Sequence, residues 1–232
     1  TSKFFYNFDR HQLLIGVNSA TPTAKLNVSG GDINLSKDNF YRYNDVKIMY
    51  ASTTLEDYFF GNAGNLTMTG TNNTAIGSLA LSSNTVGQYN MGIGANALVN
   101  NTSGNQNLAM GVSALSQLKV QDNNVALGFN ALTISTGAGN IAIGSRSNEN
   151  GTGDFNITMG YAVDQPCLTC SYQLNIANTI YGKHIREGTN NEYIGIRSSN
   201  PATALDVTGG VRMTTGAITS LSPGVMHIVA GS

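Results

Sequence analysis

The chain has 232 residues and a formal net charge of −1, and 41% of its residues are hydrophobic while only 11% are charged. This balance excludes a disordered chain, offers no electrostatic attraction for nucleic acid or an anionic membrane, and includes no apolar run near the roughly 18 residues of a membrane span. The 27 glycines and the many Asn, Ser and Thr residues favour short strands and tight turns over helices. We therefore expect an all-β protein with no nucleic-acid partner and no membrane insertion.

Residues 1–31 are predicted to form an N-terminal β connector module, which recurs near the other end of the chain. Residues 15–31 and 194–210 align without a gap, and each reads as a strand, a Pro-containing turn, a second strand and a Gly-Gly pair. The alternating apolar residues of the second strands are Leu26, Val28, Leu205 and Val207. This signature resembles the connector of phage tail-fibre proteins.

In those fibres the connector commonly precedes a self-cleaving intramolecular chaperone, which is cut off after a Ser. The resemblance implies that Ser232 could be such a mature end, although an excised fragment fits equally well. Because the chain begins at Thr1 without Met, we expect it to be a processed or excised piece of a longer protein.

Residues 32–70 are predicted to be a β-rich transition that holds much of the aromatic content, in the stretches 40–43, 47–50 and 58–60. Residues 54–60 are the nearest candidate for a helix, and no longer helix is expected anywhere.

Residues 71–163 contain six copies of one pattern, Asn followed by three residues and Gly. The recurrent positions are Asn73, Gly77, Asn90, Gly94, Asn107, Gly111, Asn124, Gly128, Asn140, Gly144, Asn156 and Gly160. Successive glycines lie 17, 17, 17, 16 and 16 residues apart, and four copies continue into Ala-Leu. This period predicts a β-solenoid of about six coils, each with two short strands. Gly is expected at a turn or bulge with positive φ, and Asn at a turn cap or in a side-chain ladder between coils.

Alternate residues of each predicted strand share a face. One face is bulky and apolar apart from Thr74, whereas the other is small throughout: Ala75, Gly92, Ala109, Ala126, Ala142 and Thr158. Since neither face is polar, we expect both to be buried, one inside the coil and one against another copy of the chain. The pattern does not say which face meets which partner, but small residues suit close approach by another backbone, and we expect sister chains to press against them.

Residues 73–81 resemble the head repeats of YadA-like trimeric autotransporter adhesins, and equally the same repeats in phage tail-fibre proteins. The resemblance covers residues 71–163 and implies a homotrimeric parallel β-roll. The last copy departs from the pattern because residues 145–148 replace its Ala-Leu half, which indicates that the roll ends there. Residues 164–193 are then expected to be a second β transition, and residues 194–232 a C-terminal β connector module.

Cys167 and Cys170 form a Cys-x-x-Cys motif, but zinc needs about four ligands, and the chain offers no other Cys and only His184 fourteen residues on. A zinc site could form if three chains pooled their ligands on a three-fold axis. A redox-active motif would need a thioredoxin-like βαβ setting, which is missing from the sequence. A local disulfide between the two cysteines is a further alternative. Two reduced thiols in a turn are the favoured interpretation. His11 and His227 have no spaced partner, and His227 is expected to be a packed strand residue.

Carboxylates are sparse. Glu149 and Asp154 lie five residues apart and form a conceivable pair for glycoside hydrolysis, but the stretch between them reads as a turn. We therefore expect no enzyme, no cofactor and no metal. The resemblance implies that the chain is a structural segment of a tail fibre in a virion. Its implied partners are other tail or fibre proteins and a receptor on the host cell, either a glycan or a protein. The candidate contact residues are Tyr89, Gln117, Phe129 and Tyr161, although Phe129 and Tyr161 fit the seam between chains equally well. A bacterial surface adhesin head is the alternative, and a glycan-degrading spike is a third possibility.

Overall fold

A computed structural model describes residues 4–7, 12–15, 26–28, 40–43, 46–52, 54–134, 136–183, 193–202 and 204–209. All regular elements among these residues are strands, as the composition predicts. Strands β1 (Phe4–Asn7), β2 (Gln12–Ile15) and β3 (Leu26–Val28) form a small sheet. His11, His184, His227, Ser232, residues 210–231 and most of the N-terminal module lie outside the described residues.

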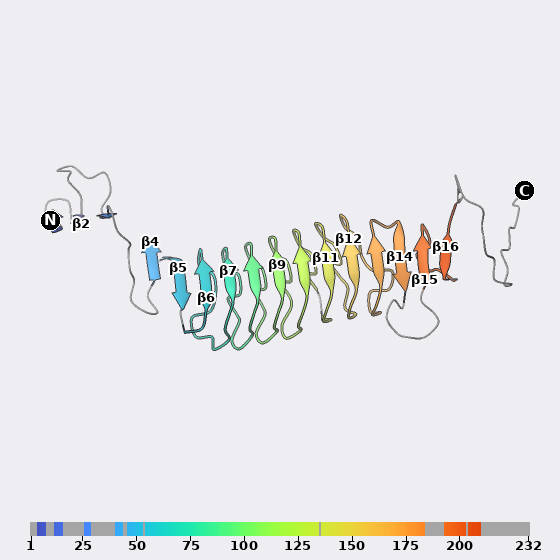
Figure 1. The fold of residues 1–232 in the computed structure, drawn as a ribbon, viewed down its shortest axis with the longest axis horizontal. Helices are drawn as coiled ribbons and strands as arrows, with labels where there is room; N and C mark the ends of the chain where they lie inside the picture. Colours follow the sequence, from blue (N-terminus) through green and yellow to red (C-terminus); the bar gives the residue numbers. More distant parts are fainter. Residues whose placement is uncertain are drawn as a thin grey trace, which may run out of the picture.

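The other thirteen strands form one long sheet in which each strand lies beside its neighbours in the sequence (Figure 1). They are β4 (Phe40–Tyr43), β5 (Val46–Ser52), β6 (Asp57–Phe60), β7 (Thr74–Ile76), β8 (Met91–Ile93), β9 (Leu108–Met110), β10 (Val125–Leu127), β11 (Ile141–Ile143), β12 (Ile157–Met159), β13 (Leu174–Ile176), β14 (Ile180–Lys183), β15 (Tyr193–Ile196) and β16 (Leu205–Val207).

Strands β6 to β13 are all parallel, and each residue of one strand pairs with the equivalent residue of the next. The chain therefore winds through seven turns of a β-solenoid whose strands all belong to a single sheet. The predicted solenoid is confirmed. It is longer than the six copies of the repeat because β6 and β13 extend it at either end. Residues 54–60, the nearest helix candidate, form a turn followed by β6.

The solenoid is bordered by antiparallel strands. At one end β4 pairs with β5 and β5 with β6, and at the other β13 pairs with β14 and β14 with β15. A parallel β15–β16 pair follows. These reversals stop the winding of the chain, so further strands continue the sheet without adding coils.

Each coil contains one strand, not the two that we expected from the period. The second half of the coil is a series of turns because its residues take left-handed backbone conformations. Leu79 has a φ of 61° and Leu81 a φ of 51°, and Leu98, Leu115 and Leu132 repeat the value of Leu81 within 2°. The last four leucines, from Leu81 to Leu132, are fully buried, whereas Leu79 is exposed, so hydrophobic burial offsets the unfavourable conformation at the four buried positions.

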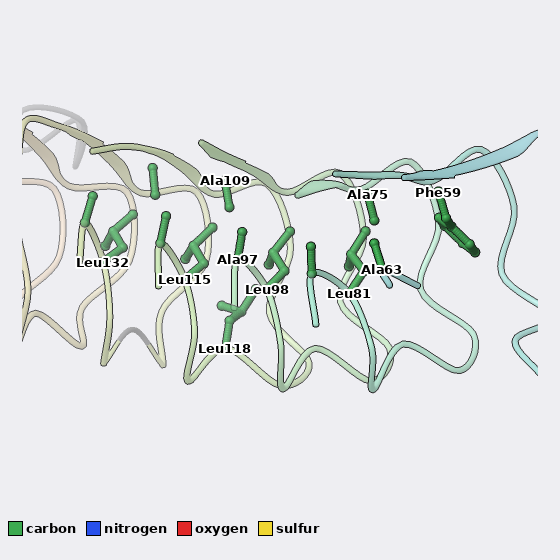
Figure 2. Packing of buried hydrophobic residues seen from close by; sticks show 14 of the residues in the cluster. Phe59, Ala63, Ala75, Leu81, Ala97, Leu98, Ala109, Leu115, Leu118 and Leu132 are labelled. Carbon is green, nitrogen blue, oxygen red and sulfur yellow. The ribbon is translucent and has the colours of Figure 1, made fainter. Parts of the chain in front are cut away.

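The core of the solenoid is a narrow row of alanines and leucines along its length (Figure 2). The small strand residues belong to this row: Ala75, Ala109, Ala126 and Ala142 have no exposed surface in the single chain. A Cβ on Gly92 would lie 3.2 Å from the oxygen of Ala97 and 3.4 Å from Cγ of Leu81, both in its own chain. The expectation that sister chains press against the small residues is therefore wrong, because the opposite wall of the same coil already occupies that space.

Candidate functional site

The sheet of the described chain has an outer face that is apolar and partly exposed to solvent. In β7 to β12 the residues on either side of the buried small residue point away from the coil, and β6 and β13 pair with these strands in the same register. We define the outer apolar face by these residues of β6 to β13, none of which is charged: Tyr58, Phe60, Thr74, Ile76, Met91, Ile93, Leu108, Met110, Val125, Leu127, Ile141, Ile143, Ile157, Met159, Leu174 and Ile176.

Much of this face is accessible in the single chain. Phe60, Met91 and Met159 keep 39–40% of their surface exposed, and Met110 keeps 46%. Strand pairing continues the face at both ends, since Met49 lies opposite Phe60 on β5. On the other side the face continues through Ile180, Ile194 and Ile196 on β14 and β15 and through Leu205 on β16. The twelve strands β5 to β16, spaced about 4.8 Å apart, carry it over roughly 50 Å.

The four candidate contact residues are all exposed but are not brought together. Phe129 and Tyr161 each follow the recurrent Gly of their coil and border the outer apolar face, with 51% and 74% of their surface exposed. Tyr89 precedes a strand, where it takes a φ of 57°, and Gln117 lies in the turn half of its coil. Only Phe129 and Tyr161 are thus placed to extend the face.

The recurrent asparagines form a buried ladder along the solenoid. In each coil the side-chain Oδ1 accepts a hydrogen bond from the backbone N–H of the equivalent residue in the next coil, at 2.9–3.0 Å. The amide nitrogens of Asn73, Asn90, Asn107 and Asn156 also donate to backbone carbonyls in the turns, at 2.7–3.1 Å. The ladder ends at Gln173, and its first member is Asp57. These contacts hold coil to coil, which is a structural role.

The six recurrent glycines have φ between 116° and 142°. Five of the six, all but Gly160, also stack tightly on the next coil: a Cβ on Gly94 would lie 2.5 Å from the oxygen of Gly111. Both the backbone conformation and the spacing of the coils therefore require Gly at this position.

Cys167 and Cys170 are joined by a disulfide, so the favoured interpretation of two reduced thiols is wrong. The backbone turn, in which the N–H of Cys170 donates to the oxygen of Cys167, brings the two Cα atoms to 5.3 Å, within the usual range for a disulfide. The closed loop supports the end of the ladder, since the side chain of Gln173 bonds to the N–H and oxygen of Cys167 and to the oxygen of Cys170.

Glu149 and Asp154 each have a structural partner. Glu149 forms an ion pair with Nε of Arg146 at 2.8 Å, and Oδ1 of Asp154 accepts a hydrogen bond from the N–H of Ala138 at 2.8 Å. The pairing with Glu149 is the main cause that raises the pKa of Arg146. The two carboxylates thus have separate contacts within the turns.

Within the described part of the chain no group of three or more His, Cys, Asp or Glu side chains could hold a metal ion, and no helix is long and apolar enough to span a bilayer. No family model, curated protein or solved structure matches the chain.

Proposed function

We propose that this chain is a structural segment of a homotrimeric attachment fibre, most specifically of a phage tail fibre that contributes to binding the host cell. The outer apolar face is the observation that carries the proposal. It is uncharged across the eight parallel strands, whereas the interior of the coil is already filled by the chain's own alanines and leucines. Such a face needs a partner in water.

The size of the face favours further copies of the chain as that partner. A strip about 10 Å wide and roughly 50 Å long has a projected area on the order of 500 Å². This is at the upper end of what monomeric proteins expose, and three such strips together reach the area of a stable interface, about 1,200–2,000 Å². An identical copy supplies a face of the same length and the same coil spacing, so its side chains match along the whole contact.

The repeats support three copies through their resemblance to trimeric adhesin heads and to tail fibres with such heads. In this arrangement the outer apolar faces meet along the axis, and the turns, with Tyr89 and Gln117, stay on the outside. Three equivalent surface patches then contact the host receptor, a glycan or a protein, so weak single contacts add up to firm attachment. Other tail proteins are the expected partners at the ends, in the virion.

A bacterial surface adhesin head is the alternative function, because its repeats are equally similar to residues 73–81. The connector signature of residues 15–31 and 194–210 favours the tail fibre. Binding of the purified protein to bacterial cells, and competition with phage adsorption, separates the two. A glycan-degradation assay tests the third possibility, an enzymatic spike.

The test of assembly is the mass of the native protein by sedimentation velocity, with a denatured control. We expect a species of three times the chain mass of 24.4 kDa. Leu127→Lys, in the middle of the outer apolar face, should yield monomers with an unchanged circular dichroism spectrum. Gln117→Lys, an exposed position in a turn, is the matched control and should remain trimeric. A wild-type chain that sediments as a well-folded monomer would overturn the proposal.

A further inference from the structure

The interior of the solenoid changes from apolar to polar in its last coils. The backbone N–H of Leu132 bonds to the oxygen of Ser147, and that of Asn148 bonds to the oxygen of Val163 at 2.7 Å, which is the pattern that stacks one leucine on the next in earlier coils. Asn148 and Asp164 therefore continue the leucine column. A buried leucine position has become an amide in one coil and a carboxylate in the next.

Four side-chain atoms of this region are buried without a hydrogen-bond partner. They are Oδ1 and Nδ2 of Asn148, Oδ1 of Asp164 and Oε1 of Gln165. Asn148 has no exposed surface and Gln165 has 3%. Gly151 makes room for the amide, since a Cβ there would lie 2.0 Å from Oδ1 of Asn148.

Further polar side chains belong to the same coils. Oγ of Ser147, next to Asn148, lies 3.0 Å from Oγ1 of Thr158, and Thr158 pairs across the sheet with Asn175. Nδ2 of Asn175 donates to the backbone oxygen of Asp164 at 2.6 Å. The last coils thus carry hydroxyl, amide and carboxylate groups at positions that hold alanine and leucine in earlier coils.

Three of the four unsatisfied atoms are oxygens, and one belongs to a carboxylate. Each buried acceptor without a partner costs about 1–3 kcal/mol. Arg146, the nearest cationic residue in the sequence, is paired with Glu149. Among the described residues, no ion pair or hydrogen bond joins a Lys or Arg side chain to Asn148, Asp164 or Gln165.

We propose that Asn148, Asp164 and Gln165 form a binding site for a hard cation of the Ca²⁺ class inside the last coils. Ca²⁺ takes 6–8 oxygen ligands and accepts carboxylate, amide and backbone oxygens together. The two side-chain amides and the single carboxylate would supply three of them, and backbone oxygens and water the rest. With only one carboxylate the site is weak, with a Kd of about 10⁻⁴–10⁻³ M. The cation would stabilise the end of the solenoid where the apolar core stops.

The test is calcium binding by the full chain, measured by isothermal titration with CaCl2 and by thermal unfolding with CaCl2, MgCl2 or a chelator. We expect one Ca²⁺ per chain and, at tenfold excess over Kd, a rise in the unfolding midpoint of roughly 3–6 °C. Asp164→Asn should weaken binding at least tenfold. Asn148→Leu, which restores the leucine column, should abolish binding without loss of folding.

Asp122→Asn is the matched control, because it makes the same change at a carboxylate that accepts hydrogen bonds from Asn105, far from the cluster. It should bind calcium as the wild type does. Absence of binding to the wild type, or equal binding by Asp164→Asn, would overturn the proposal. The result does not depend on oligomeric state, so it fails or succeeds separately from the proposed trimer.

Discussion

Oδ1 of Asp57 accepts two hydrogen bonds from Asn73, one from the backbone N–H at 2.8 Å and one from the side-chain amide at 3.2 Å. Asp57 is fully buried and is the first member of the asparagine ladder. Its second oxygen, Oδ2, has no hydrogen-bond partner. At the same place, four of the later asparagines present an amide nitrogen that donates to a backbone carbonyl.

Asp57→Asn should stabilise the protein at neutral pH. Burial is the main cause that raises the pKa of Asp57 above its ordinary value of 3.8, against the lowering effect of the hydrogen bonds from Asn73. A raised pKa in the folded state means that the stability contributed by this carboxyl is present below about pH 4 and is lost as the pH rises through the folded-state pKa. Urea unfolding between pH 3 and 8 should show this loss in the wild type. A variant whose stability falls with pH as the wild type's does would contradict the prediction.

Asn107→Ala should break the ladder in the middle of the solenoid. It removes the acceptor of the Asn124 N–H and the donor to the oxygen of Gln121, leaving buried groups unsatisfied. We expect a loss of about 3 kcal/mol in the free energy of unfolding. Gln117→Ala, at an exposed turn position, should change it by less than about 0.5 kcal/mol. Equal effects of the two substitutions in denaturant unfolding would argue against a role for the ladder in stability.

Gly94→Ala should destabilise the solenoid far more than Gly61→Ala, although both glycines follow a strand of the same sheet. Gly94 has a φ of 128°, and its added Cβ would lie 2.5 Å from the backbone of the next coil. At Gly61 φ is 71° and the nearest atom would be 3.9 Å away. We expect the free energy of unfolding to fall by about 3 kcal/mol or more in Gly94→Ala and by about 1 kcal/mol in Gly61→Ala. Thermal unfolding of the two variants measures the difference, and similar midpoints would contradict it.

Replacing both cysteines, Cys167→Ser with Cys170→Ser, should loosen the end of the solenoid locally. A disulfide across so short a loop contributes about 2 kcal/mol. The loop accepts a hydrogen bond from the N–H of Thr152 through the oxygen of Leu168, at 2.7 Å. Hydrogen exchange of the Thr152 amide should therefore become faster, whereas the amide of Asn107, in the middle of the ladder, should keep its protection. Uniform faster exchange would indicate global destabilisation instead.

The repeat predicted the solenoid because the period, the asparagine and the glycine all reflect contacts between one coil and the next. It did not predict the extra coils, since β6 has Asp57 and Phe59 at the Asn and Ala positions, and β13 has Gln173 and Ala177 at the Asn and Gly positions. A search for any amide or carboxylate at the first position would have found both strands.

The direction of the two strand faces could not be read from the sequence. Both faces lack charge, so alternation alone does not distinguish the interior of a coil from a contact between chains. The width of the coil decides which strand face points inward. The leucine column, with Leu81 and Leu98, fills the interior and leaves room only for Ala or Gly on the facing strand. The polar cluster at Asn148 and Asp164 was likewise hidden, because the Ala-Leu signature that marks these positions in earlier coils is already lost there.

Every asparagine of the ladder offers the same acceptor to the coil above and uses the same donor toward the coil below. A coil can therefore be inserted or deleted as a whole without disturbing the bonds of the remaining coils. Duplication or loss of 16 or 17 codons in the gene would lengthen or shorten the protein in steps of about 4.8 Å. The reach of the molecule is thus adjustable by recombination, independently of the surfaces at its two ends.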